Sequence, residues 1–148
     1  MPIRPELRHF YRGPHWQTTR ERILKRAGNK CEQCRKPNGK MVFTVCCGST
    51  MYWARVGSSR WRNHRGAVTP VRTILRAIPT RKPRMIRVVL TIAHLDHTPG
   101  HDDDNNLRAW CQWCHLHHDQ PHHIETRAAT RVRKLDAARP LLQAMEVS

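Results

Sequence analysis

Two Cys-x-x-Cys pairs constrain the fold of this chain more than any other feature of its sequence. They are Cys31–Cys34 and Cys111–Cys114. Each pair can present two thiolates from one tight turn, and two pairs complete the tetrahedral four-sulfur set that zinc prefers. A redox-active dithiol is the alternative for one pair alone, but two pairs far apart in the sequence favour a metal. We therefore expect a structural zinc site that closes the intervening chain around a small core.

The length of the chain, 148 residues, leaves room for one compact domain, so we expect residues 1–148 to form a single α+β domain. The first residues contain no apolar leader, and no apolar stretch is long enough to span a bilayer. We therefore expect a cytoplasmic protein with reduced thiols. The two other cysteines, Cys46 and Cys47, are adjacent and chelate one ion poorly, so they are expected to be reduced strand residues.

The charge of the chain predicts a polyanionic partner. Lys and Arg number 27 against 11 Asp and Glu, which gives a formal net charge of +16. Self-repulsion on this scale destabilises a compact monomer unless bound anions offset it. DNA is the expected partner, because neutralised phosphates release counterions and supply affinity. A membrane is not expected, since no helix shows a bulky apolar face, and nothing indicates a small-molecule cofactor.

A basic insertion is predicted over residues 46–85. From Gln33 to Leu95 the chain has thirteen Lys or Arg residues and no Asp or Glu. We expect a phosphate-contacting arm, with Trp53 and Trp61 available for stacking on bases; the alternative is a solvated loop. The candidate DNA-binding residues are Arg55, Arg60, Arg62 and Arg65 in the insertion and Arg127 and Arg131 in a C-terminal helix.

The remaining pattern predicts a small number of regular elements. Residues 1–15 are expected to be an irregular basic arm. A helix is expected over 18–27, from a Thr18-x-x-Glu21 capping box to the stop at Gly28. Strands are expected at 41–45 and 51–54, and a buried β-branched strand over 86–93. An amphipathic helix is expected over 122–138, bounded by prolines at 121 and 140.

The segment from His94 to His115 carries the most specific motif. A strand ending in His94 is followed by Asn106-Leu after twelve residues, and by a Cys-x-x-Cys-His ending in His115 after nine more. This pattern resembles the HNH endonuclease family, in particular its small zinc-bearing members from phages and prophages. The resemblance covers residues 31–34 and 86–119.

The resemblance implies a ββα-metal fold: a strand over 86–93, a second over about 107–110 and a helix from about 112, with further helices flanking this module. It also implies roles for three residues. His94 matches the general base, Asn106 the residue that braces the loop or helps to hold the metal, and His115 a ligand of a catalytic Mg²⁺, Mn²⁺ or other divalent ion. A neutral imidazole suits a base near pH 7.

One departure from the family leaves the ligand set open. The family commonly places Asp or His directly before the base, where this sequence has Ala93. Either Asp96 or His97 supplies that ligand, or the register is shifted and Asp96-His97 is itself the ligand and base. Asp119 lies one helical turn after His115 and is either a second ligand or a cap before the proline at 121.

The sequence thus predicts a metal-dependent DNA endonuclease that hydrolyses phosphodiester bonds. A zinc-containing protein that binds DNA without cutting it is the first alternative, because it would need the same charge and the same cysteines. A nuclease acting on RNA is the second, since composition does not distinguish the two nucleic acids.

Overall fold

The computed structural model describes residues 5–47, 49–77 and 82–146, and only the backbone of 77 and 140–146. Residues 1–4 of the predicted arm and residues 48 and 78–81 of the predicted insertion lie outside the described residues. The chain forms two compact units, Met1–His115 and Leu116–Ser148. All described strands belong to the first unit, and the second is the continuation of the last helix.

The N-terminal region is more regular than predicted. A 3-10 helix, η1, covers Pro5–Tyr11, and α1 covers Pro14–Arg26. The prediction of an irregular arm and of a helix start at residue 18 was wrong, because a proline in the first turn lacks only an N–H that would be unsatisfied there anyway. The stop at Gly28 is confirmed: its φ is +60°, and Asn29 N–H donates to the Leu24 carbonyl at 2.9 Å.

The predicted insertion is part of a five-stranded antiparallel sheet of order β4-β3-β2-β1-β5. The hairpin of β1 and β2 confirms the two strands predicted at 41–45 and 51–54. The helix α2 contacts β1. The elements are β1 (Met41–Cys47), β2 (Thr50–Arg55), β3 (Trp61–Asn63), β4 (Val68–Thr69), α2 (Val71–Ala77) and β5 (Arg84–Arg87).

The strand predicted over 86–93 is divided between two sheets. Its first part, β5, pairs with β1, whereas β6 (Leu90–His94) pairs with β7 (Leu107–Cys111). At the break, Val88 exchanges hydrogen bonds with the 39–40 backbone, and the amide of Gln112 bonds to Arg87 O and Val89 N. The prediction of one continuous strand over 86–93 was therefore wrong, because these bonds turn the chain from one sheet to the other.

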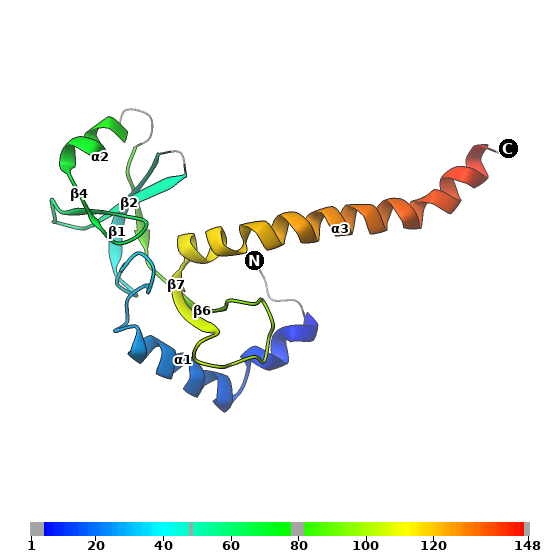
Figure 1. The fold of residues 1–148 in the computed structure, drawn as a ribbon, viewed down its shortest axis with the longest axis horizontal. Coiled ribbons are helices and arrows are strands. Elements are labelled where there is room, and N and C mark those ends of the chain that lie inside the picture. Colours follow the sequence, from blue (N-terminus) through cyan, green and yellow to red (C-terminus); the bar gives the residue numbers. More distant parts are fainter. Residues whose placement is uncertain (1–4, 48, 78–81, 147–148) are drawn as a thin grey trace. The chain divides into compact units, whose positions relative to one another are not determined.

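The hairpin of β6 and β7 leads directly into α3, which covers Gln112–Glu146. In the first unit, α1 lies beside this hairpin (Figure 1). The order strand, loop, strand, helix agrees with the prediction, and the molecule is α+β.

The prediction of a separate helix over 122–138 was wrong, because α3 is continuous through the prolines at 121 and 140. A proline inside a helix removes one backbone hydrogen bond, and the bonds on either side maintain the helix. Among the described helices, none is both long enough and apolar enough to cross a membrane.

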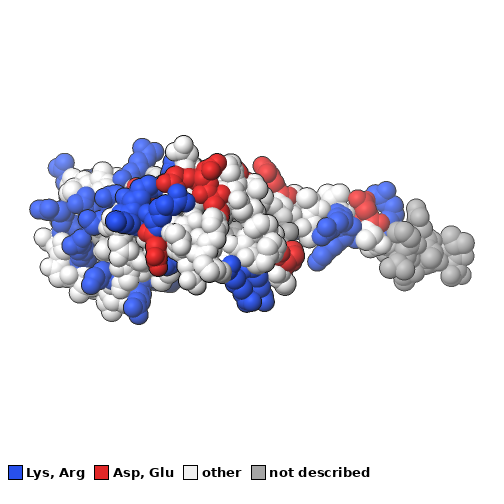
Figure 2. Space-filling model, turned by 90° about the horizontal axis from the view of Figure 1, so that it is seen from below, with Lys and Arg blue, Asp and Glu red and all other residues white. Residues whose placement is uncertain are grey.

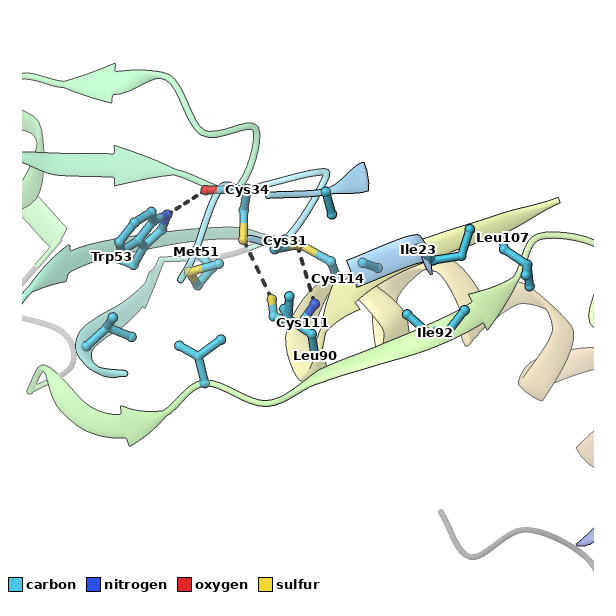
Figure 3. Packing of buried hydrophobic residues seen from close by; sticks show 14 residues of the cluster. Ile23, Cys31, Cys34, Met51, Trp53, Leu90, Ile92, Leu107, Cys111 and Cys114 are labelled. Carbon is cyan, nitrogen blue, oxygen red and sulfur yellow. Dashed lines mark hydrogen bonds between the residues drawn. The ribbon is translucent and has the colours of Figure 1, made fainter. Parts of the chain in front are cut away.

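The core of the first unit surrounds the four cysteines (Figure 3). Ile23 from α1, Val42 from β1, Leu90 from β6 and Leu107 from β7 are buried in one cluster with them. The cysteine cluster therefore joins α1, the five-stranded sheet and the hairpin.

Candidate functional site

The four cysteines form a site with the dimensions of a tetrahedral metal centre. All four are buried, and their sulfur atoms lie within 4.8 Å of one another. Cys34 Sγ and Cys111 Sγ are 3.6 Å apart, close to the ~3.8 Å that follows from four sulfurs at ~2.3 Å around one zinc. The cluster can hold a structural metal ion such as zinc, and four thiolates leave no coordination position for a reacting water.

Hydrogen bonds among the four cysteines lower the pKa values of Cys31 and Cys111 and raise those of Cys34 and Cys114. The pKa of Cys111 is lowered to about 7, first by its hydrogen bond with Cys114 and also by the positive charge of Lys36. The Lys36 side chain is only 1% exposed. Four thiolates around a divalent cation carry a net negative charge, so a buried ammonium group nearby offsets the cost of burying that charge. The Cys111 N–H also donates to Cys31 Sγ at 3.4 Å.

Ion pairs and backbone bonds attach the first Cys-x-x-Cys turn to the hairpin. The Glu32 carboxylate accepts a 2.7 Å hydrogen bond from Ala109 N–H and pairs with Arg26. Arg26 also donates to the carbonyls of Asp104 and Leu107, both at 2.6 Å. The cluster and α1 thus hold β7 and the end of the loop before it.

Asn106 braces the loop that joins β6 to β7. Its side-chain N–H groups donate to Asp96 Oδ1 at 2.9 Å and to the His101 carbonyl at 2.8 Å. Its Oδ1 accepts a bond from Asp96 N–H, and its carbonyl accepts one from Leu95 N–H. Asn106 therefore ties the two ends of this loop together.

His94 is buried at the end of β6. Its side chain is 4% exposed, and Nε2 lies 2.9 Å from Asp102 Oδ1. The imidazole stacks on Trp16 of α1, with ring centroids 5.6 Å apart, and Tyr11 of η1 lies edge-on to it. The other Asp102 oxygen faces His15 at 3.1 Å. Burial, and secondarily the charge of Asp102, raise the pKa of Tyr11.

Asp96 and His97 lie on the loop itself. Asp96 Oδ2 is 2.6 Å from His101 Nδ1, and this bond is the main reason that the pKa of Asp96 falls well below its usual range and that of His101 is raised. His97 is half-buried with φ +58°. A residue with a side chain rarely adopts this left-handed conformation, and such strain concentrates at functional sites.

The predicted residues of α3 lie on two parts of that helix. His115, in its first turn, is oriented by Thr91 of β6, whose hydroxyl is 3.0 Å from His115 Nδ1. In the second unit, Asp119 lies 3.9 Å from His123 Nε2, one turn further on. Arg127 and Arg131 are exposed on α3.

The predicted DNA-binding residues of the insertion do not all line the same hollow. Arg55, Arg60 and Arg62 line one hollow of the first unit, whereas Arg65 is not among the residues that line it. Figure 2 shows Lys and Arg side chains gathered over the end of this unit that holds the five-stranded sheet. Trp53 does not offer a ring for stacking, because its side chain belongs to the core.

Sequence reasoning missed four residues of these sites. Asp102 is not among the predicted site residues, although it lies eight residues after His94 and contacts it. Lys30, Arg35 and Lys36 flank the first Cys-x-x-Cys pair, and their proximity to it was the available signal. Comparisons of the chain with family models, curated proteins and solved structures found no match.

Proposed function

We propose that this protein is a metal-dependent endonuclease that hydrolyses phosphodiester bonds in DNA. The observation that carries the proposal is the brace at Asn106. It fixes the loop that carries Asp96 and His97 and that follows His94 at the end of β6. The cysteine cluster anchors both strands of this hairpin, and His115 lies in the first turn of α3, immediately after the second strand. The residues of the HNH-like motif thus belong to one hairpin and the helix that follows it.

The geometry favours His97 over His94 as the general base. A base must reach the attacking water, and the His94 ring is almost wholly buried between Trp16 and Asp102. His97 is half-buried and held in a strained backbone conformation on the braced loop. In this register His94 is a positioning residue, which ties the loop to α1 through Trp16.

We include a catalytic divalent ion in the proposal because of the chemistry of its candidate ligands. In the sequence, Asp119 follows His115 by four residues, and an imidazole and a carboxylate form a mixed set that suits Mn²⁺ or a similar divalent ion. When bound, such an ion would polarise the phosphate and stabilise the leaving oxygen. Asp96 is a weaker candidate, because its carboxylate already accepts bonds from Thr98, Asn106 and His101.

The test is the cleavage of supercoiled plasmid with Mg²⁺, with Mn²⁺ or with no added ion. Omitting the ion is preferable to adding a chelator, which would also remove zinc from the cysteines. We expect His97→Ala to lower the cleavage rate by roughly 10² to 10⁴, the range for a positioned base, with zinc content and folding unchanged. His115→Ala should lose activity that high Mn²⁺ partly restores.

His94→Ala separates the two registers. If His94→Ala abolishes cleavage while a folded His97→Ala variant cuts normally, His94 is the base. If both folded variants cut as the wild type does, the endonuclease proposal is wrong.

A DNA-binding protein without catalysis is the second candidate function. The burial of His94 and the concentration of arginines around one hollow favour it. DNA binding without cleavage under any ion condition would support it, and preferential cleavage of RNA in the same assay would support an RNA nuclease.

A further inference from the structure

A basic hollow of about 680 Å³ lies where the first Cys-x-x-Cys turn meets the β2–β3 hairpin. Its lining includes no acidic residue. The turn contributes Lys30 and Arg35, which flank the two cysteines, and the hairpin contributes Arg55, Arg60 and Arg62. Five cationic side chains from two distant segments of the chain therefore surround one space.

The two walls of the hollow are fixed to each other. The indole N–H of Trp53, on β2, donates to the Cys34 carbonyl at 2.9 Å, and this tryptophan is 2% exposed. Gly66 packs so closely on the turn that a Cβ there would lie 2.9 Å from Arg35 Cγ. Arg62 Nη1 donates to the Gly66 carbonyl at 2.7 Å. The cations thus project from a rigid junction that includes the cysteine cluster.

Such an arrangement is costly without an anion. Like charges around one hollow repel each other and lower the stability of the fold unless bound negative charge offsets them. Arginine forks match phosphate oxygens in a bidentate geometry, and the volume falls within the range of about 300 to 1000 Å³ typical of ligand sites. Because Trp53 is buried, it presents no ring face on which a base would stack, so phosphates are the better fit.

We propose that this hollow binds consecutive backbone phosphates of a DNA strand, and that a metal held by the four cysteines would fix the turn that forms one of its walls. The choice of DNA rests on the proposed function, whereas the phosphate site rests on the geometry of the hollow. None of the residues that line the hollow comes from the loop between β6 and β7, so in this proposal the hollow holds the strand and takes no part in the chemistry.

Binding to a fluorescent DNA duplex, measured by anisotropy over a range of salt concentrations and with no added divalent ion, tests the proposal. The Arg55→Gln/Arg60→Gln pair should weaken binding by roughly tenfold or more and reduce the slope of log affinity against log salt by about 1.8, which is 0.9 for each lost contact. The control pair Arg72→Gln/Arg76→Gln removes the same charge from exposed positions on α2 and should leave the slope nearly unchanged. Equal losses in both pairs would overturn the proposal in favour of diffuse attraction, and tighter binding of an RNA duplex would overturn the choice of DNA.

Inorganic pyrophosphate tests whether phosphate groups bind in this hollow. Its addition to the zinc-loaded protein should shift the NMR signal of the Trp53 indole N–H, which lies at the junction of the two walls, and the Arg55→Gln/Arg60→Gln pair should reduce this shift. No shift in the wild type would overturn the phosphate site. Neither measurement involves cleavage. The phosphate site can therefore be confirmed in a protein that does not cut DNA, and it can be absent from a protein that does.

Discussion

At the scale of single residues, the link between Asp96 and His101 makes the loop between β6 and β7 sensitive to pH. The pKa of Asp96 is lowered by hydrogen bonds from His101, Thr98 N–H and Asn106, and the pKa of His101 is raised chiefly by its bond to Asp96, with Asp103 adding to it. The Asp96 contribution to stability is present above the ordinary Asp pKa of about 3.9 and is lost as the pH falls through its lowered value. The His101 contribution is present below about 6.5 and is lost as the pH rises through its raised value.

We therefore expect the loop to be most ordered between about pH 4 and pH 6.5. An NMR titration without added divalent ion should place the His101 midpoint above its ordinary value. Asp96→Asn should move that midpoint down, because the charged partner is lost, whereas Asp136→Asn, at an exposed acid on α3, serves as the control. An unchanged His101 midpoint in Asp96→Asn would show that this pair is not formed in solution.

At the scale of elements, Gly66 determines how closely the insertion packs on the first Cys-x-x-Cys turn. Its φ is +82°, and a Cβ would lie 2.9 Å from Arg35 Cγ and 3.4 Å from the Cys34 backbone. Gly66→Ala should lower the free energy of unfolding by about 1 to 2 kcal/mol for the left-handed conformation alone, with a further loss from the contact. It should also weaken DNA binding, because Arg35 must move.

Gly39→Ala is the matched control for this variant. Gly39 has a φ of +70°, but nothing lies within 4 Å of a Cβ placed there. It should therefore show the backbone cost without the loss of DNA binding. Chemical denaturation and anisotropy measure the two effects, and identical behaviour of the two variants would mean that the contact with Arg35 is unimportant.

At the scale of the whole molecule, the cysteine cluster links α1, the sheet and the hairpin. Metal binding to such a site contributes directly to the free energy of folding. We expect one zinc per chain, and we expect Cys31→Ser or Cys111→Ser to unfold the first unit or lower its melting temperature by roughly 10 °C or more. Cys47→Ser, at an exposed position on β1, should retain zinc and melt normally. Metal-free wild-type protein with an unchanged melting temperature would contradict a structural metal.

The features that the sequence determined by itself are those with a local cause. A Cys-x-x-Cys turn brings two thiolates together within four residues, and two such turns were enough to predict the four-sulfur cluster. The stop at Gly28 and the β1–β2 hairpin also follow from short patterns, because glycine conformation and side-chain alternation act between near neighbours in the chain. The expectation of β7 and of the start of α3 came instead from the family resemblance.

Only the tertiary structure decided the features that depend on distant segments. Trp16 and Asp102 bury His94 from two sides, the bonds at Val88 divide one expected strand between two sheets, and Arg35 meets Arg55 across the hollow. Each of these contacts depends on how separate elements pack around the buried cysteines. Hydrophobic periodicity in a short segment carries no information about such packing. The burial of His94 and the grouping of the arginines around one hollow are therefore visible only in the folded chain.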